Sequence, residues 1–237
     1  MGQSYFIWKN RDCRAMGVRM QGPAAIVRPE ERVNHVQIPG ASGDLTQTEG
    51  EDIYNSYIQT ATILVKGGFR VREIYNWLKG SGYVTFSGEP DRRQAARIIG
   101  AITLNRHSYN LDWWVGEVQF YCQPFKELLG ETVTEITSSG AAIINAGDVM
   151  EKPLIKVTPS ASSATIAAGA RSMTVTGLTS GTAFFIDCGS MEVLNADKTA
   201  SLLKNATGAF PTLTPGNNTI TGSGWSKLEI TRRERFL

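Results

Sequence analysis

The sequence predicts a mainly β protein in two parts: an α+β domain with one helix over residues 1–130, and a β-sandwich over residues 131–237. The composition changes near residue 125, because both histidines and every tryptophan except Trp225 precede that point. After it, Thr, Ser, Ala and Gly dominate. Short runs there alternate between polar and apolar residues, which is typical of antiparallel sandwiches.

Six strands and one helix are expected in the first part. The helix is predicted over Phe69–Leu78, because Val71, Ile74 and Leu78 recur at helical spacing and Gly80 follows as a stop signal. The last strand is expected to end at Gln123-Pro124, since proline cannot donate to a ladder. The strands are predicted at Tyr5–Trp8, Gly17–Met20, Ile58–Lys66, Tyr83–Ser87, Ile98–Leu104 and Trp113–Tyr121.

Two segments of the second part are assigned by composition. The run Ser160–Ala170 consists mainly of small residues, and we expect it to be an exposed sheet edge or a loop. Turn residues fill Pro215–Asn218, with short strand-like runs on both sides, so a β-turn is expected there.

Composition limits the classes of function. The net charge of +2 is too balanced to indicate a polyanion-binding surface. Cys13, Cys122 and Cys188 lie far apart and are odd in number, so we expect buried free thiols rather than disulfides or a zinc site. We see no signal peptide, and no apolar run is long enough to span a membrane.

No catalytic pattern stands out. Phosphate-binding, dinucleotide-binding and nucleophile-elbow motifs are absent, and His35 and His107 are far apart in sequence. Carboxylates that could pair in space are expected to solvate turns instead: Asp44, Glu89, Asp91, Asp112 and Asp187. We therefore expect no enzyme activity, no cofactor and no bound metal.

Aromatic residues offer candidate contacts. Adjacent strand residues point to opposite faces, so Trp114 is expected in the core and Trp113 toward a neighbouring subunit or a loop, although a stacking platform is an alternative. Tyr54 and Tyr57 could anchor a neighbouring subunit or lie in the core. Trp225 is the candidate contact of the second part, for a protein partner or a sugar.

The order of short motifs along the whole chain resembles the distal tail proteins (Dit) of long-tailed bacteriophages with flexible, non-contractile tails. The motifs are Phe6–Asp12, Val36–Leu45, Tyr75–Leu78 with Val84–Ser87 and Glu89–Asp91, Val118–Phe125, Asn145–Gly147 before Lys152–Val157, Phe184–Asp187, Phe210–Asn218 and Leu228–Arg233. The chain departs from the family at two loops, where Ala41-Ser42 replaces an arginine and Arg92-Arg93 replaces an aromatic pair.

The resemblance implies a first domain that assembles six copies into a ring and a second, galectin-like β-sandwich domain outside it. It implies tail-tube and baseplate hub or tail fibre proteins as partners, DNA only in transit, no membrane, and a place in the virion after assembly in the host cytoplasm. The alternative is a lectin-like tail or cell-surface adhesion module. The lack of tyrosine after residue 131 favours a scaffold over that alternative.

Overall fold

The computed structural model describes residues 4–67, 71–107 and 112–237. Contacts within the chain divide it into two compact units. The first unit contains residues 1–129 with Leu237, and the second contains residues 130–236. Each unit has its own cluster of buried apolar side chains.

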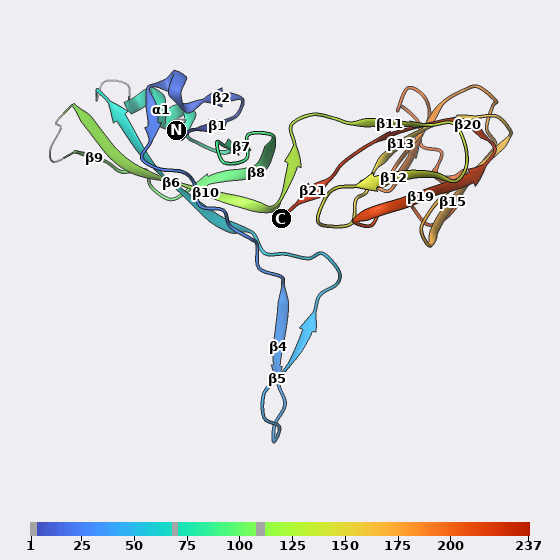
Figure 1. The fold of residues 1–237 in the computed structure, drawn as a ribbon, viewed down its shortest axis with the longest axis horizontal. Helices are drawn as coiled ribbons and strands as arrows, with labels where there is room; N and C mark the ends of the chain where they lie inside the picture. Colours follow the sequence, from blue (N-terminus) through green and yellow to red (C-terminus); the bar gives the residue numbers. More distant parts are fainter. Residues whose placement is uncertain (1–3, 68–70, 108–111) are drawn as a thin grey trace. The chain divides into compact units, whose positions relative to one another are not determined.

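An antiparallel sheet forms the body of the first unit (Figure 1), in the order β2-β1-β7-β8-β10-β6-β3, with β9 also paired to β10. A separate pair, β4-β5, completes the strands of this unit. The elements in chain order are β1 (Phe6–Trp8), β2 (Arg11–Asp12), the 3₁₀ helix η1 (Cys13–Met16), β3 (Val18–Met20), β4 (Val33–Gln37), β5 (Asp44–Thr48), β6 (Tyr57–Lys66), α1 (Val71–Trp77), β7 (Ser81–Phe86), β8 (Arg92–Ile99), β9 (Leu104–Arg106) and β10 (Trp113–Leu128).

The core lies on one face of this sheet, because its strands alternate between buried and accessible residues. In β6, Ala61, Ile63 and Val65 are buried whereas their neighbours are accessible. Helix α1 covers the buried face with Ile74 and Trp77. The Trp77 ring stacks on Phe6 at 5.6 Å, and the indole N–H groups of Trp8 and Trp77 each donate to the other's carbonyl at 3.2 Å. These pairs fix the helix to the sheet.

Helix α1 is where its spacing predicted it, although residues 69 and 70 of the expected range lie outside the described residues. Two strand predictions need correction. The segment Ile98–Leu104 is not one strand, because β8 ends at Ile99 and β9 begins at Leu104. Strand β10 continues through Pro124 to Leu128, since its register with β8 shifts between Cys122 and Lys126 and this irregularity accommodates the missing N–H.

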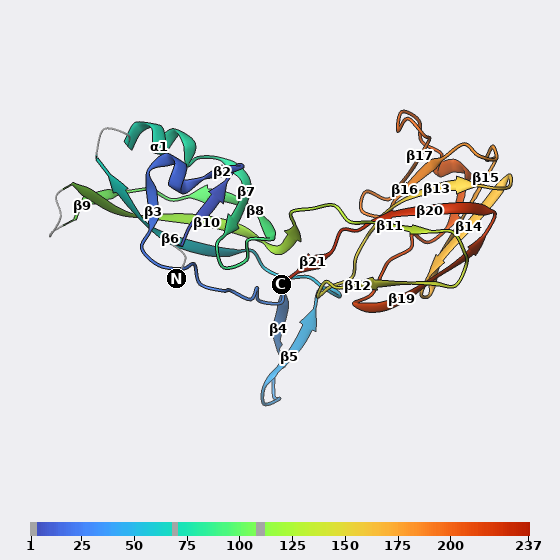
Figure 2. The ribbon, with the colours of Figure 1, turned by 45° about the horizontal axis from the view of Figure 1, so that its top comes forward.

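The second unit is a β-sandwich of two five-stranded antiparallel sheets (Figure 2). Their orders are β11-β20-β13-β16-β17 and β12-β19-β14-β15-β18. The elements are β11 (Val133–Ile136), β12 (Ala141–Asn145), β13 (Leu154–Pro159), β14 (Ser163–Ala168), β15 (Arg171–Thr176), β16 (Phe184–Asp187), β17 (Glu192–Leu194), the 3₁₀ helix η3 (Leu203–Asn205), β18 (Ala206–Gly208), β19 (Gly216–Ser223), β20 (Trp225–Thr231) and β21 (Arg235–Phe236).

The small-residue segment Ser160–Ala170 was wrongly expected at an edge or in a loop. Its strand β14 lies in the middle of its sheet, between β19 and β15. Ala164, Ile166 and Ala168 are buried there at 2% exposure or less. Small side chains suit this central place, because they let the two sheets approach closely.

The expected turn at Pro215–Asn218 is shorter than predicted, since β19 already begins at Gly216. Asn217 and Asn218 pair in register with Ile144 and Ile143 of β12. The buried Asn218 side chain closes the bend by donating to the carbonyls of Thr214 and Gly216 at 2.7 and 3.0 Å and accepting from the Thr214 N–H at 2.9 Å. The asparagine therefore shapes the turn from inside the strand.

Candidate assembly surfaces

Strands β4 and β5 form an arm, which we define as residues 33–48 and which belongs to neither core. The two strands pair only with each other, from Val33 opposite Thr48 to Gln37 opposite Asp44 (Figure 1). Apart from Val33, every residue of these strands is exposed. An isolated two-stranded hairpin is marginally stable in water. The pairing of β4 with β5 therefore contributes little by itself to holding the arm in one conformation.

The base of the arm is tied by a short antiparallel ladder. The Arg32 N–H donates to the Ile53 carbonyl at 2.9 Å, and the Asn55 N–H donates to the Glu30 carbonyl at 2.8 Å. The Arg32 guanidinium also donates to the Asn55 side chain at 3.1 Å and lies 3.7 Å from Glu49. These bonds define where the arm leaves the first unit.

The two faces of the arm differ in character. Val36 and Leu45 are cross-strand partners, so both side chains lie on one face. They are 44% and 56% exposed, and Ile38 beside them is 48% exposed. The opposite face is polar, with Thr46 Oγ1 3.4 Å from His35 Nδ1. The arm is thus amphipathic, with its apolar face uncovered.

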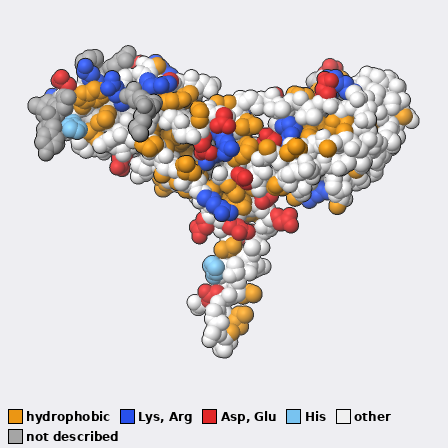
Figure 3. All heavy atoms as spheres, viewed as in Figure 1, with side chains coloured by type: hydrophobic (Ala, Val, Ile, Leu, Met, Phe, Trp, Pro, Cys, Tyr) orange, Lys and Arg blue, Asp and Glu red, His pale blue; other side chains and the backbone are white. Residues whose placement is uncertain are grey.

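Charge is concentrated near the base of the arm. Residues 30–52 carry six carboxylates against the single Arg32, a net charge of −5. Five of the six flank the hairpin rather than lie within it: Glu30, Glu31, Glu49, Glu51 and Asp52. Figure 3 shows this acidic group at the base and apolar side chains farther along the arm. We call residues 30–32 and 49–52 the acidic collar.

The second uncovered surface is the face of the large sheet opposite the core. Tyr121 is the cross-strand partner of Ile58 on one side and of Arg97 on the other. Ile58 and Tyr121 are 52% and 41% exposed, and Tyr83 on the neighbouring β7 is 41% exposed. The Arg93 guanidinium lies 4.4 Å from the Tyr83 ring. We call Ile58, Tyr83, Tyr121 and Arg97 the outer patch.

The candidate interface residues predicted from sequence do not come together. Tyr57 and Trp113 lie at opposite ends of the β6–β10 ladder, opposite Cys122 and Lys66. Trp113 is half-buried, with the Arg19 guanidinium 5.1 Å from its ring. Tyr54 packs edge-on against Phe125, with 5.8 Å between ring centroids. Each residue has partners within its own chain.

Tyr57 is bound into the core side of the sheet. Its hydroxyl donates to Gln94 Oε1 at 3.1 Å, and Gln94 Nε2 lies 2.9 Å from the hydroxyl oxygen. Burial raises the pKa of Tyr57 to about 12, although the bond with Gln94 acts in the opposite direction. Tyr57 was expected either to anchor a neighbouring subunit or to lie in the core, and these contacts are those of a core residue.

The position of Trp225 corrects the expectation that its side chain contacts a protein partner or a sugar. Its side chain is buried in the sandwich core at 9% exposure. The indole Nε1–H donates inward to the Thr165 carbonyl at 3.2 Å. A sugar-stacking ring must expose a face. Trp225 in this conformation therefore offers no stacking platform.

The expected carboxylates are dispersed over the molecule. Glu89 lies 2.7 Å from the buried Lys126 ammonium, whereas Asp44 lies on the arm. Asp187 of the second unit pairs with Arg233 at 2.8 Å. Within the described ranges, no group of three or more His, Cys, Asp or Glu residues is placed to hold a metal ion. No helix in those ranges is long and apolar enough to cross a membrane.

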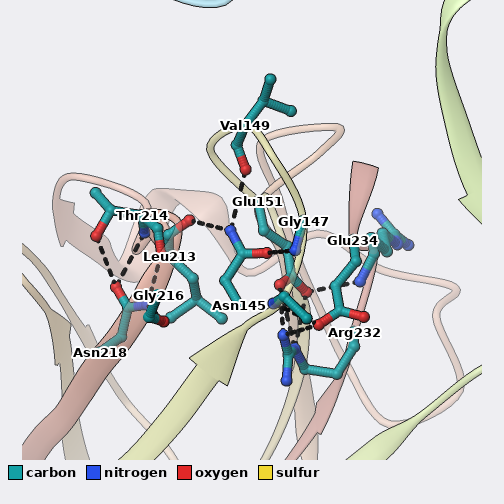
Figure 4. A network of polar contacts seen from close by, with 12 residues as sticks. Asn145, Gly147, Val149, Glu151, Leu213, Thr214, Gly216, Asn218, Arg232 and Glu234 are labelled. Atoms are coloured by element: carbon teal, nitrogen blue, oxygen red, sulfur yellow. Dashed lines mark hydrogen bonds and ion pairs between the residues drawn. The ribbon is translucent and has the colours of Figure 1, made fainter. Parts of the chain in front are cut away.

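The Asn145–Gly147 segment and Arg232 stabilise the second unit through side-chain hydrogen bonds, a role that was not predicted from the sequence. They build a polar network at the beginning and end of the second unit (Figure 4). Asn145 Nδ2 donates to the carbonyls of Val149 and Leu213, each at 3.0 Å, and its Oδ1 accepts from the Gly147 N–H at 2.9 Å. This one side chain therefore ties together two chain segments far apart in sequence.

A buried ion pair lies in the same network (Figure 4). The Arg232 guanidinium donates through Nε to both carboxylate oxygens of Glu151, at 3.2 and 3.1 Å, and through a terminal nitrogen at 3.1 Å. The Glu151 side chain is 0% exposed and that of Arg232 is 8% exposed. The Arg233 N–H adds a 2.6 Å bond to Glu151, and Glu234 also binds Arg232. We call Glu151, Arg232 and Glu234 the clamp.

These features define a mainly β, two-unit protein with two uncovered surfaces, in which no cluster of His, Cys, Asp or Glu among the described residues is placed to hold a metal ion. The fold is that of the SPP1 Dit protein (gp 19.1), described as a paradigm of the hub adsorption apparatus in phages that infect Gram-positive bacteria. The match has a TM-score of 0.81 with 17% identity and covers 100% of both chains.

A second solved structure, the phage p2 baseplate in its activated conformation with Sr, matches with a TM-score of 0.47 and 9% identity over 98% of this chain and 97% of that one. No family model matches the sequence, and no curated protein does.

Proposed function

We propose that this chain is a structural tail-tip protein of a long-tailed bacteriophage. Six copies form a closed ring that joins the tail tube to the baseplate hub or tail fibre proteins. The observation that carries this proposal is the full-length agreement with the SPP1 Dit fold at a TM-score of 0.81. The protein acts in the virion after assembly in the host cytoplasm, as a scaffold without enzymatic activity.

Ring formation is assigned to residues 1–130. A ring requires a heterologous contact, in which two different surfaces of identical copies meet and the rotation closes. The first unit has two such surfaces, because both the apolar face of the arm and the outer patch are uncovered within one chain. Trp113, which is half-buried at the far end of the same sheet, is a further candidate contact.

The galectin-like sandwich, residues 131–237, is proposed to face outward and to receive baseplate proteins. The polar network around Asn145 and the Arg232–Glu151 pair would keep the first and last segments of this unit in place when baseplate proteins bind. DNA passes through the ring without being held there. The near-neutral net charge of +2 favours this, because a strongly basic bore would bind phosphates and slow transit.

Light scattering of the purified protein tests the proposal directly. Six copies give a mass six times that of the 25.9 kDa chain, about 155 kDa, and negative-stain images should show six-fold rings. A protein that stays at the monomer mass at micromolar concentration in every buffer would contradict the ring. Tail-tube protein that is not retained on an immobilised ring would contradict the assigned docking role.

A further inference from the structure

We propose that the arm of one copy lies on the outer patch of a second copy, with the apolar residues Val36, Ile38 and Leu45 against Ile58, Tyr83 and Tyr121. This deepens the proposed ring function and rests on it, because it names the two surfaces that would form the contact between subunits. The acidic collar of the first copy is then placed to meet basic residues of the second.

The apolar matching is the first argument. Each surface presents three large apolar side chains that are between 41% and 56% exposed: Val36, Ile38 and Leu45 on the arm, and Ile58, Tyr83 and Tyr121 on the sheet. Both surfaces are uncovered in the same chain, so a chain's own arm does not cover its own patch. A contact between copies would remove both sets from water, and each fully buried side chain adds favourable free energy.

Charge complementarity is the second argument. The arm and its collar carry a net charge of −5, whereas the outer face of the sheet has four basic residues, Arg19, Lys66, Arg93 and Arg97, against the three acidic residues Asp12, Glu117 and Glu127. Arg97 lies within the patch, is exposed, and has no ion-pair partner in the described part of the chain. The acidic arm and the basic residues of the outer face have opposite charge, so their approach is electrostatically favourable.

The geometry of the arm is the third argument, because it selects one face. Val36 and Leu45 are directly opposed in the β4–β5 register, and the alternation of side chains puts His35 and Thr46 on the other face. Only the Val36–Leu45 face can therefore pack on an apolar patch. The contact is heterologous, which is the type that closes into rings.

Disulfide trapping between mixed copies tests the contact. Val36→Cys and Tyr121→Cys variants are purified separately, mixed, allowed to exchange subunits and mildly oxidised. The matched control pairs Thr46→Cys, on the polar face of the same arm, with Tyr121→Cys. Background reaction should be low, because all three native cysteines are buried. We expect a crosslinked dimer containing one copy of each variant from Val36→Cys and little from the control.

A second measurement does not depend on crosslinking. Leu45→Asp should raise the concentration needed for half-assembly by about tenfold or more, whereas Thr46→Asp should change it little. Both positions are exposed, so unchanged circular dichroism and thermal unfolding will show that each variant folds. Arg97→Glu should weaken assembly most in low salt, since ions screen this pairing.

The outcomes separate the two proposals. The contact would be overturned, and the ring kept, by one combination of results. In that combination six-fold rings form, Val36→Cys crosslinks no better than Thr46→Cys, and Leu45→Asp leaves the rings intact. Specific crosslinks in open chains or dimers would support the contact and contradict the closed ring. A wild-type monomer with neither crosslink would overturn both. Unaffected self-assembly with loss of binding to another tail protein would assign the arm to that protein instead.

Discussion

Replacing Arg232 with alanine should destabilise the second unit strongly, because it leaves the Glu151 carboxylate buried without its main counter-charge. Glu151 is 0% exposed and receives three of its bonds from the Arg232 guanidinium. Removing one member of a buried ion pair typically costs about 3–5 kcal/mol of unfolding free energy. For a unit of this size that corresponds to a fall in melting temperature of about 12 °C or more.

The matched control is the neighbouring arginine. Arg233 makes a similar pair with Asp187, but its side chain is 42% exposed and that of Asp187 is 19% exposed. Ion pairs with this accessibility contribute below about 1 kcal/mol, so Arg233→Ala should shift stability only slightly. Arg232→Lys should be intermediate, since lysine keeps the charge and loses the planar fork.

The assay is urea unfolding of the full chain, with hydrogen exchange read by mass spectrometry to assign each transition to a unit. Arg232→Ala should lower the midpoint for peptides of residues 130–236 and leave the peptides of the first unit unchanged. Equal shifts for Arg232→Ala and Arg233→Ala would refute the reasoning, because burial would then not determine the energy of these pairs.

Three further predictions concern single sites. Gly116→Ala should destabilise the first unit, because a Cβ atom there would lie 2.4 Å from the Thr103 carbonyl oxygen. A Cβ atom at Gly88 would have no atom within 4 Å, so Gly88→Ala is the control and should leave thermal unfolding nearly unchanged. Burial raises the pKa values of Cys122 and Cys188 to about 12, so both thiols should react with Ellman's reagent at pH 8 only after unfolding; rapid reaction of the folded protein would contradict this. Burial tends to raise the pKa of Asp187, but bonds from Arg233, Ser190 and Gly189 outweigh it and hold the pKa below its usual value. The stabilisation this gives is therefore present at neutral pH and lost as pH falls through the folded-state pKa, so the stability difference between wild type and Asp187→Asn, measured by urea unfolding, should shrink in acid and not in base.

Sequence reasoning predicted the elements that carry strong periodic patterns. Helix α1 was placed because Val71, Ile74 and Leu78 recur at helical spacing, and the mainly β character was predicted from alternation. Most of strand β8 was missed because Arg92 and Arg93 were wrongly assigned to a loop, whereas they are the first two residues of this strand. Arg93 is held in the sheet by Glu127 and the Tyr83 ring, two partners on neighbouring strands that the sequence does not reveal.

The candidate surfaces were less predictable from the sequence. A surface can be recognised as uncovered only when the folded chain shows which residues pack against it. Val36–Leu45 was noted for its motif, but nothing local indicates that the two strands there would pair only with each other. Tyr54 and Tyr57 were marked for their aromatic character, and their partners Phe125 and Gln94 are distant in sequence. The clamp depends on Glu151 meeting Arg232 across 81 positions, which only the folded chain shows.

The clamp also lies where a mechanical load on the ends of the second unit would enter its sheet. The first and last strands of the sandwich, β11 and β20, are antiparallel neighbours with Val133 opposite Thr231, so both chain ends leave from the same end of the ladder. A pull on those ends would open such a ladder one rung at a time, which is the weak direction for a sheet. The Arg232–Glu151 pair sits beside the first rung, where the tension enters, and would have to rupture before the strands could peel apart.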